Sequence, residues 1–119
     1  MKVIIFGSNG LLGNTITKYF LDNSSYETFP ILRDSSKIML FKKKYHKSFI
    51  VIKNILDFEE IKKKIKNIRP DILINCIGIT NKVPKNNTSY FEDLIRVNSL
   101  FPHMLHRISL DLNARLIHL

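Results

Sequence analysis

Gly7-Ser8-Asn9-Gly10-Leu11-Leu12-Gly13 is the stretch of sequence that decides the fold. It follows a short apolar run at 2–6 and precedes an amphipathic segment at 11–21. Between a strand and a helix, the first glycine of such a motif allows a sharp turn, the second lets a phosphate approach the backbone, and the third lets the helix pack closely. Free N–H groups and the dipole at the helix start favour a bound phosphate. The motif therefore predicts nucleotide binding, and the alternative is a glycine-rich turn that serves packing alone.

Apolar runs alternate with amphipathic segments along the rest of the chain. The pattern predicts strands at 2–6, 26–32, 49–52, 71–76 and 115–119, and helices at 11–21, 37–44, 58–68 and 90–110. A polar loop is expected at 81–89. Because strands and helices alternate throughout, we predict an α/β fold, with a doubly wound parallel sheet covered by helices on both faces. The whole of 1–119 is expected to be one domain, with the sheet truncated after about five strands.

Two prolines bear on these elements. Pro30 is compatible with the second strand only if its missing N–H faces a strand end. Pro102 is expected to kink or divide the last helix.

Two of the predicted helices have a recognisable apolar face. In the first helix the expected face is Leu12, Ile16, Tyr19 and Phe20. In the segment 58–68 it is Phe58, Ile61, Ile65 and Ile68. The lysine triplet at 62–64 then lies on the solvent side of that helix.

The formal net charge of +9 raises the question of a nucleic-acid partner. A solvated helix face accounts for one lysine triplet, and the chain lacks the interleaved aromatic residues of an RNA-binding motif. We therefore expect no nucleic-acid partner. No apolar run approaches the roughly 20 residues of a membrane span, and the N-terminus lacks the apolar region of a signal peptide. We expect no membrane partner and a cytoplasmic location.

Cys76 is the single cysteine of the chain, so it has no internal disulfide partner. It is expected to be a buried small residue at a strand end rather than a reactive thiol. His103 and His106 are three residues apart on a predicted helix, but no third ligand accompanies them. We expect no metal site.

Four motifs, in order along the whole chain, resemble the extended short-chain dehydrogenase/reductase superfamily. The glycines have the spacing G-x-x-G-x-x-G, and 71–78 is similar to the fourth strand of that family and the glycine after it. The segment 97–103 resembles its V-N-…-P helix, and 114–119 resembles its fifth strand. Within the superfamily, the most similar group is that of dTDP-4-dehydrorhamnose reductase-like sugar-nucleotide reductases. The resemblance implies a Rossmann-type fold that binds NAD(P).

The resemblance and the strand ends together assign the cofactor-binding residues. They are Gly7, Ser8, Asn9, Gly10, Leu11, Leu12, Gly13, Arg33, Leu56, Asp57, Cys76, Ile77, Gly78 and Thr80. Arg33 ends the second strand, where an arginine suits the 2′-phosphate of NADP and an acidic residue suits NAD. NADP is preferred and NAD stays open, because Asp34 follows directly. A solvent-exposed turn is the alternative for Arg33.

Two further residues have assigned roles with an alternative each. The resemblance places Asp57 near the adenine, and its other role is that of helix N-cap. Asn98 matches the asparagine that helps to organise the family's proton relay, which makes it the one catalytic candidate in this chain. The alternative for Asn98 is an ordinary polar side chain on a helix.

The remaining catalytic residues of the family are a serine or threonine and a Tyr-x-x-x-Lys pair, expected after the fifth strand. None of Tyr19, Tyr26, Tyr45 and Tyr90 has a lysine four residues later. The chain is therefore expected to be the cofactor-binding part of a reductase that transfers hydride to a 4-keto sugar nucleotide. A non-catalytic NADP-binding or regulatory module, and a nucleotide-sugar epimerase or dehydratase fragment, are the alternatives. Because 115–119 would expose an unpaired apolar edge, marginal stability or self-association is expected.

Overall fold

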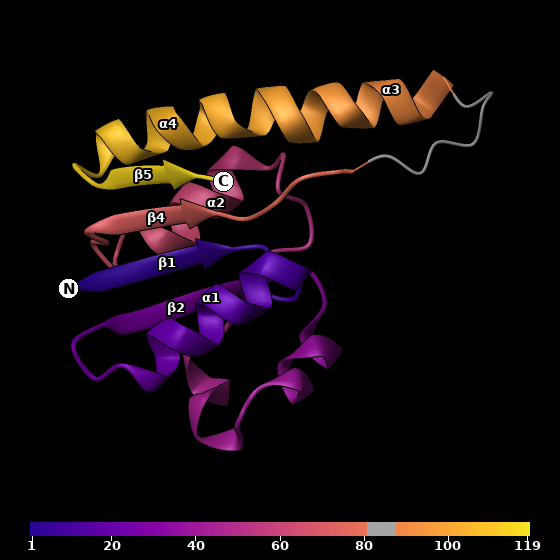
Figure 1. The fold of residues 1–119 in the computed structure, drawn as a ribbon. Helices are drawn as coiled ribbons and strands as arrows, with labels where there is room; N and C mark the ends of the chain where they lie inside the picture. The colour runs from indigo at the N-terminus through magenta and orange to yellow at the C-terminus, as the bar shows by residue number, and fades with distance from the viewer. Residues whose placement is uncertain (81–87) are drawn as a thin grey trace.

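Five parallel strands form a single sheet in the computed structural model, which describes residues 1–80 and 88–119 (Figure 1). The strands are β1 (Lys2–Phe6), β2 (Glu27–Leu32), β3 (Ile50–Val51), β4 (Ile72–Asn75) and β5 (Arg115–His118). Their order in the sheet is β3-β2-β1-β4-β5, and every neighbouring pair is parallel. The chain therefore reverses its direction of progress across the sheet between β1 and β4. In such a doubly wound, Rossmann-type sheet, ligands bind at the carboxyl ends of the two strands that flank this reversal.

Helices cover both faces of the sheet. They are α1 (Leu11–Asp22), α2 (Phe58–Ile65), α3 (Thr88–Ile95) and α4 (Phe101–Asp111), with short turns η1 (Ser35–Leu40), η2 (Lys43–Ser48) and η3 (Arg96–Leu100). Side chains of α1 pack on one face, and side chains of α2 and α4 pack on the other. In Figure 1, α3 extends beyond the carboxyl ends of the strands. The predicted layered α/β architecture is confirmed.

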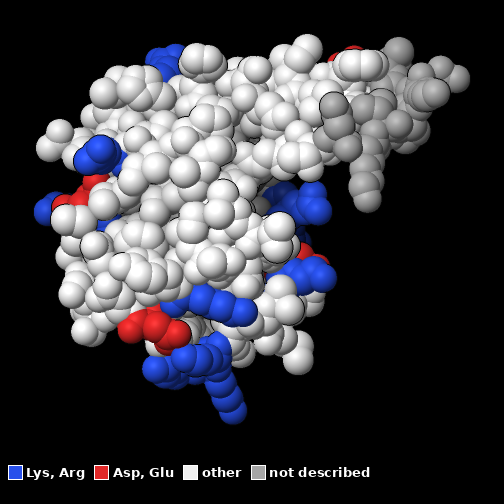
Figure 2. Space-filling model, viewed as in Figure 1, with Lys and Arg blue, Asp and Glu red and all other residues white. Residues whose placement is uncertain are grey.

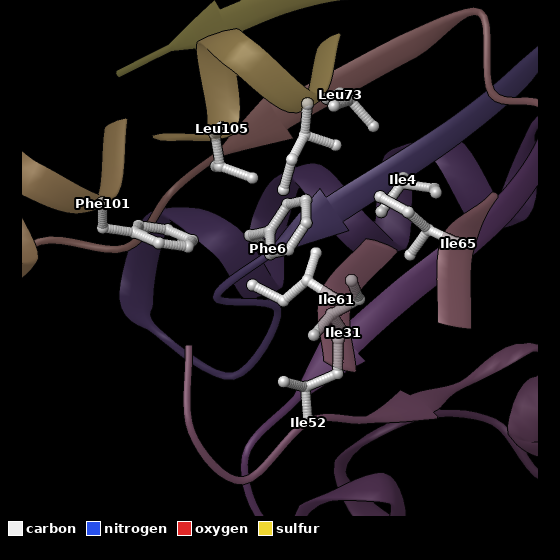
Figure 3. Close-up of a cluster of buried hydrophobic side chains, with 10 residues drawn as sticks. Ile4, Phe6, Ile31, Ile52, Ile61, Ile65, Leu73, Phe101 and Leu105 are labelled. Carbon is white, nitrogen blue, oxygen red and sulfur yellow. The ribbon is translucent and has the colours of Figure 1, made fainter. Parts of the chain in front are cut away.

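The core divides into two layers because successive side chains of a strand point to opposite faces. Ile4 and Phe6 of β1 belong to the layer beneath α2 and α4, whereas Val3 and Ile5 belong to the layer beneath α1. Figure 3 shows Phe6 among side chains from both α2 and α4. Its ring meets that of Phe101 edge to face, with ring centroids 5.8 Å apart. Phe6 thus joins β1 to α4 at the end of the sheet where the glycine motif begins.

Pro30 lies within β2 without breaking the ladder. In a parallel strand, the N–H and C=O groups of one residue point to the same side. The carbonyl of Leu32 accepts from Ile52, so alternate residues such as Leu32 and Pro30 point toward β3. Pairing with β3 begins only opposite Ile31, one residue after Pro30. The missing N–H of Pro30 therefore faces a place where β3 has not yet begun, as the sequence requires.

The first helix is rotated relative to the face that the sequence predicts. Gly13 and Thr17 are the buried residues of α1, and Ile16 and Phe20 pack beside them. Leu12 is 52% exposed and Tyr19 is 64% exposed, so the prediction that both belong to the packed face is wrong. The close approach of Gly13 to the sheet sets the rotation of the helix. In α2 the predicted face is confirmed for Phe58, Ile61 and Ile65. The helix ends at Ile65 rather than at 68, and Ile68 packs against the core from the turn that follows.

The segment after β2 also differs from its prediction. Two 3₁₀ turns, η1 and η2, replace the short α-helix expected at 37–44. Asp22, at the end of α1, holds this segment in place: the Tyr45 hydroxyl donates to its carboxylate at 2.6 Å, and the Lys42 ammonium donates at 3.0 Å. The Tyr45 hydrogen bond, followed by that of Lys42, lowers the pKa of Asp22. These tertiary contacts compete successfully with a weak local helix propensity.

A π-turn changes the pitch of the last long helix just before Pro102. Across η3 the Phe101 N–H donates to the Arg96 carbonyl, five residues back instead of four. Pro102 has no N–H to give to the carbonyl four residues earlier, and its ring would collide with it. The wider turn accommodates both restrictions, so α3, η3 and α4 follow one another without a break. The predicted irregularity at Pro102 is thus present as a π-turn. The loop expected at 81–89 lies largely outside the described residues.

Replacement of Phe101 tests the junction between α4 and β1. Phe101→Ala should lower the free energy of unfolding by about 3–5 kcal/mol, because the ring is fully buried and its removal leaves a cavity. The measurement is a urea titration followed by circular dichroism. Phe91→Ala is the matched control, since Phe91 on α3 is 60% exposed and should change stability by less than about 0.5 kcal/mol. Equal effects of the two changes would contradict this account of the core.

Candidate functional site

The glycine motif forms the turn between β1 and α1, and two of its glycines are needed for packing. Gly7 has φ +82°, a left-handed conformation that favours glycine. A Cβ at Gly7 would lie 2.9 Å from the Ile77 side chain, and a Cβ at Gly13 would overlap the Gly7 carbonyl oxygen. The Cβ added at Gly13 would also come within 3.3 Å of the Cys76 Cβ. Both glycines therefore allow α1, β1 and the segment after β4 to meet closely.

Gly10 is different, because no residue in the described ranges 1–80 and 88–119 requires a glycine there. Its φ of −70° and ψ of 168° are accessible to any residue. Among the residues that the structure describes, a Cβ at Gly10 would meet only the Gly7 carbonyl oxygen, at the ordinary contact distance of 3.4 Å. No other described residue lies within 4 Å of that Cβ position. A glycine at this position leaves room for a group from outside the chain, as a pyrophosphate needs.

The start of α1 also offers hydrogen-bond donors to such a group. The helix has no side-chain N-cap and no acidic residue in its first turn. Its first backbone bond runs from the Asn14 N–H to the Gly10 carbonyl at 2.8 Å. The preceding amides of Leu11, Leu12 and Gly13 belong to the helix start, where no carbonyl precedes them in the helical pattern. Leu11 is 95% exposed, so this end of α1 is open to a ligand.

Ser8 lies within the motif, but its side chain faces inward. It is fully buried, and its hydroxyl donates to the Ile5 carbonyl at 3.0 Å. Its backbone N–H donates to the Ile31 carbonyl at 3.3 Å, which ties the turn to the end of β2. The side chain of Ser8 thus shapes the turn, whereas Asn9 is exposed at its outer edge.

The segment after β4 closes one side of the site. Asn75 is fully buried, and its side-chain oxygen accepts from the Ile77 N–H at 2.9 Å. This turn lays Cys76 and Ile77 against Gly7 and Gly13. Gly78 and Thr80 follow and are exposed at the carboxyl edge of the sheet. Burial raises the pKa of the half-buried Cys76 thiol, which suits the packing role predicted for it.

Asn98 holds this same segment from the other side. Its side-chain oxygen accepts from the Ile79 N–H at 2.8 Å, and its side-chain nitrogen donates to the Ile79 carbonyl at 2.9 Å. Asn98 lies in the π-turn η3, where its side chain is next to the backbone N–H and carbonyl of Ile79. The side chain therefore fixes the path of the chain beyond β4, and its predicted part in a proton relay stays a prediction.

The end of β2 presents one cation and one carboxylate. Arg33 and Asp34 are both exposed. Asp34 caps η1, accepting from the Ser36 N–H at 2.9 Å. This backbone hydrogen bond is the main reason why the pKa of Asp34 is lowered, with smaller contributions from Lys37 and Arg33. One oxygen of Asp34 is therefore engaged within the turn, while Arg33 lies at the carboxyl end of β2.

Asp57 performs its alternative role as the N-cap of α2. One carboxylate oxygen accepts from the Glu60 N–H at 3.0 Å. Leu56 is half-buried, and its N–H donates to the Asn54 side chain at 3.0 Å. Both residues lie in the turn that follows β3. Their predicted contact with an adenine stays a prediction.

The structure thus brings the predicted residues to the carboxyl ends of β1, β2, β3 and β4. The glycine turn is in direct contact with Cys76 and Ile77 of the segment after β4. Among the described residues, no group of three or more side chains is arranged to hold a metal ion. In the same part of the chain, no helix combines the length and apolar character of a membrane span. The hydrogen bond between the Asn75 and His118 side chains is a contact near the site that sequence reasoning missed.

The basic residues are dispersed on the face seen in Figure 2. Lys and Arg side chains lie in separate patches there, some of them beside Asp or Glu, rather than in one continuous groove. Several lysines are paired: Lys42 with Asp22, Lys62 with Asp111, and Lys64 with Glu60. The expected solvated role of the lysines at 62–64 agrees with this arrangement.

The chain belongs to the NAD dependent epimerase/dehydratase family, whose sequence model matches residues 3–119. A search of curated protein sequences gives no significant match. Many solved structures share the fold. A hypothetical dTDP-4-dehydrorhamnose reductase from Sulfolobus tokodaii has a TM-score of 0.71 at 19% identity, over 99% of this chain and 38% of that one.

Two further neighbours were solved with a dinucleotide bound. The Bacillus anthracis dTDP-4-dehydrorhamnose reductase in complex with NADP has a TM-score of 0.67 at 24% identity, over 97% of this chain and 34% of that one. The Bordetella bronchiseptica enzyme WbmG in complex with NAD has a TM-score of 0.76 at 16% identity, over 99% and 36%. This chain therefore spans less than half the length of these three neighbours.

Alanine substitutions at Gly13 and Gly10 distinguish a glycine that packing requires from one that leaves space for a ligand. Gly13→Ala should lower the free energy of unfolding by about 3 kcal/mol or more, because the methyl group would overlap the Gly7 carbonyl. Gly10→Ala should change it by less than about 0.5 kcal/mol, because the methyl group has room. Urea denaturation of both variants measures the difference. A large loss for Gly10→Ala would mean that this glycine is needed for packing after all.

Proposed function

We propose that this chain is the NADP-binding part of a sugar-nucleotide reductase. The observation that carries the proposal is Gly10 at the start of α1: the described part of the fold needs no glycine there and leaves open space beside it. A pyrophosphate in that space would accept hydrogen bonds from the first amides of α1 and benefit from the helix dipole. The position, at the reversal of strand order between β1 and β4, supports the same ligand.

Cys76, Ile77, Gly78 and Thr80 would flank the nicotinamide end of the cofactor. They follow β4, and the first two already pack against the glycine turn. The cofactor supplies a hydride when bound. The residues of this chain bind and orient it, while Asn98 keeps the segment around Ile79 in position through its paired hydrogen bonds.

Arg33 supports NADP over NAD. It lies at the end of β2, where the ribose 2′ position of a bound dinucleotide is recognised. A guanidinium forms strong, often bidentate hydrogen bonds with phosphate. Asp34 would ordinarily favour an unphosphorylated ribose, but one of its oxygens already caps η1. Ser35 and Ser36 are exposed beside Arg33, and Ser35 offers a further donor, whereas the Ser36 side chain bonds to Asp34.

Transfer of hydride to a 4-keto sugar nucleotide is the activity that we propose for the whole protein. The four ordered motifs and the dTDP-4-dehydrorhamnose reductases among the structural neighbours support it. An epimerase or dehydratase of nucleotide sugars is the second candidate, favoured by the match to that family over residues 3–119. WbmG was also solved with both NAD and UDP, a nucleotide such a substrate would carry.

We further propose that the exposed edge of β5 promotes self-association of the chain.

Cofactor binding is tested by titrating the chain with NADPH and following the nicotinamide fluorescence. Gly10→Ala should weaken binding at least tenfold, because the methyl group would occupy the space of the pyrophosphate, while the fold stays intact. Leu110, exposed on α4, gives the control Leu110→Ala, which should bind as the original chain does. Equal affinity of Gly10→Ala and the original chain would overturn the proposed site.

The choice of cofactor is tested by comparing NADPH with NADH. Arg33→Gln should weaken NADPH binding by roughly 10- to 100-fold, the range for loss of a charged hydrogen bond, and leave NADH nearly unchanged. Arg107→Gln, an exposed change on α4, is the matched control. If Arg33→Gln weakened both cofactors equally, the preference for NADP would be wrong.

A further inference from the structure

A buried amide at the end of β4 joins the site to β5. Asn75 is fully buried, and its side chain makes two hydrogen bonds. Its oxygen accepts from the Ile77 N–H at 2.9 Å, and its nitrogen lies 3.0 Å from Nδ1 of His118. Asn75 and His118 are opposite each other in the β4–β5 ladder, and the Leu119 N–H donates to the Asn75 carbonyl. The two side chains are therefore held together by the backbone pairing.

These contacts determine the protonation of the His118 ring. A backbone N–H can only donate, so the atom of Asn75 that faces Ile77 must be its oxygen. The amide nitrogen then faces His118, and it can only donate. Nδ1 of His118 must accept this hydrogen bond, which requires a neutral ring with its proton on Nε2. The other tautomer and the imidazolium would both place a donor against a donor.

The hydrogen bond between Asn75 and Ile77 holds a residue that itself contacts the glycine motif. The turn that it stabilises lays Cys76 and Ile77 on Gly7, where a Cβ would come within 2.9 Å of the Ile77 side chain. Such a close fit leaves little freedom for Ile77 to move without moving Gly7. A rotated Asn75 amide would lose the Ile77 bond and loosen the same contact. The orientation of Asn75 is thus linked to the shape of the turn that precedes α1.

We propose that His118 is a positioning residue for the dinucleotide site. Its neutral ring, protonated on Nε2, fixes the Asn75 amide, and Asn75 fixes the Cys76–Ile77 segment against the glycine turn. His118 acts through Asn75 and needs no contact with the cofactor. The role in binding rests on the proposed function, whereas the tautomer and the amide orientation follow from the contacts alone.

Three variants test the role of the Nδ1 acceptor. His118→Phe keeps a ring of similar size but removes the acceptor, so the buried amide loses a partner. His118→Asn is the conservative variant, because its Oδ1 is as many bonds from the backbone as Nδ1 and can accept the same hydrogen bond. His103→Phe is the matched control, since His103 is exposed on α4. Circular dichroism establishes that each variant is folded.

NADPH titration of the chain gives the binding readout. His118→Phe should weaken NADPH binding about tenfold, which corresponds to roughly 1.4 kcal/mol. His118→Asn should restore most of this loss, and His103→Phe should bind as the original chain does. Equal binding by His118→Phe and the original chain would overturn the positioning role while leaving the proposed function intact. An equal loss in His118→Phe and His118→Asn would also overturn it, because a general need for the histidine ring would then explain both.

Nitrogen-15 NMR of the original chain supplies a readout that needs no cofactor. The His118 ring in contact with Asn75 should show a protonated Nε2 and an unprotonated Nδ1. The Ile77 amide should change its chemical shift and exchange faster with solvent in His118→Phe, and return toward its original behaviour in His118→Asn. A proton on Nδ1, or an Ile77 amide indifferent to His118→Phe, would overturn the inference. If no form of the chain bound NADPH or NADH, the proposed function would fail, and these two signals would still decide the link between His118 and Asn75.

Discussion

The first helix can lie against the central strand only because Gly13 has no side chain. A Cβ there would overlap the carbonyl oxygen of Gly7 and come within 2.8 Å of its carbonyl carbon. The same approach places the start of α1 at the carboxyl end of β1, beside the segment that leaves β4. The rotation of α1, the burial of Thr17 and the exposure of Leu12 follow from it. The candidate site exists because this one contact is so close.

Two side-chain amides then fix the segment that closes the site. Asn75 accepts a hydrogen bond from the Ile77 N–H in the turn at the end of β4. Asn98 holds Ile79 from the helical side, and it can do so because the π-turn before Pro102 places it there. A buried or paired amide is rigid because its donor and acceptor must both be satisfied. The residues 76–80 that follow β4 are therefore anchored at Ile77 and at Ile79.

The residues of the predicted site differ in whether their role inside the fold is enough to explain them. Gly7, Gly13 and Ser8 have sufficient explanations inside the protein, in backbone conformation, close packing and a buried hydroxyl bond. Asp57 has a sufficient explanation as a helix cap. In the described part of the chain Gly10 and Arg33 have none, since one leaves open space and the other is an exposed cation. Residues that the fold does not require are the ones that point to a ligand.

The sequence by itself determined the strands, the helices on both faces and the location of the glycine turn, because these depend on local periodicity and on glycine spacing. It also determined that Pro102 would disturb its helix. Only the tertiary structure decided that α1 turns Leu12 outward, that Asp22 draws 35–48 into two 3₁₀ turns, and that Asn75 pairs with His118. The last two depend on residues far apart in the chain, since 23 positions separate Asp22 from Tyr45 and 43 separate Asn75 from His118. Local patterns contain no information about such distant partners, which meet only when the sheet has formed.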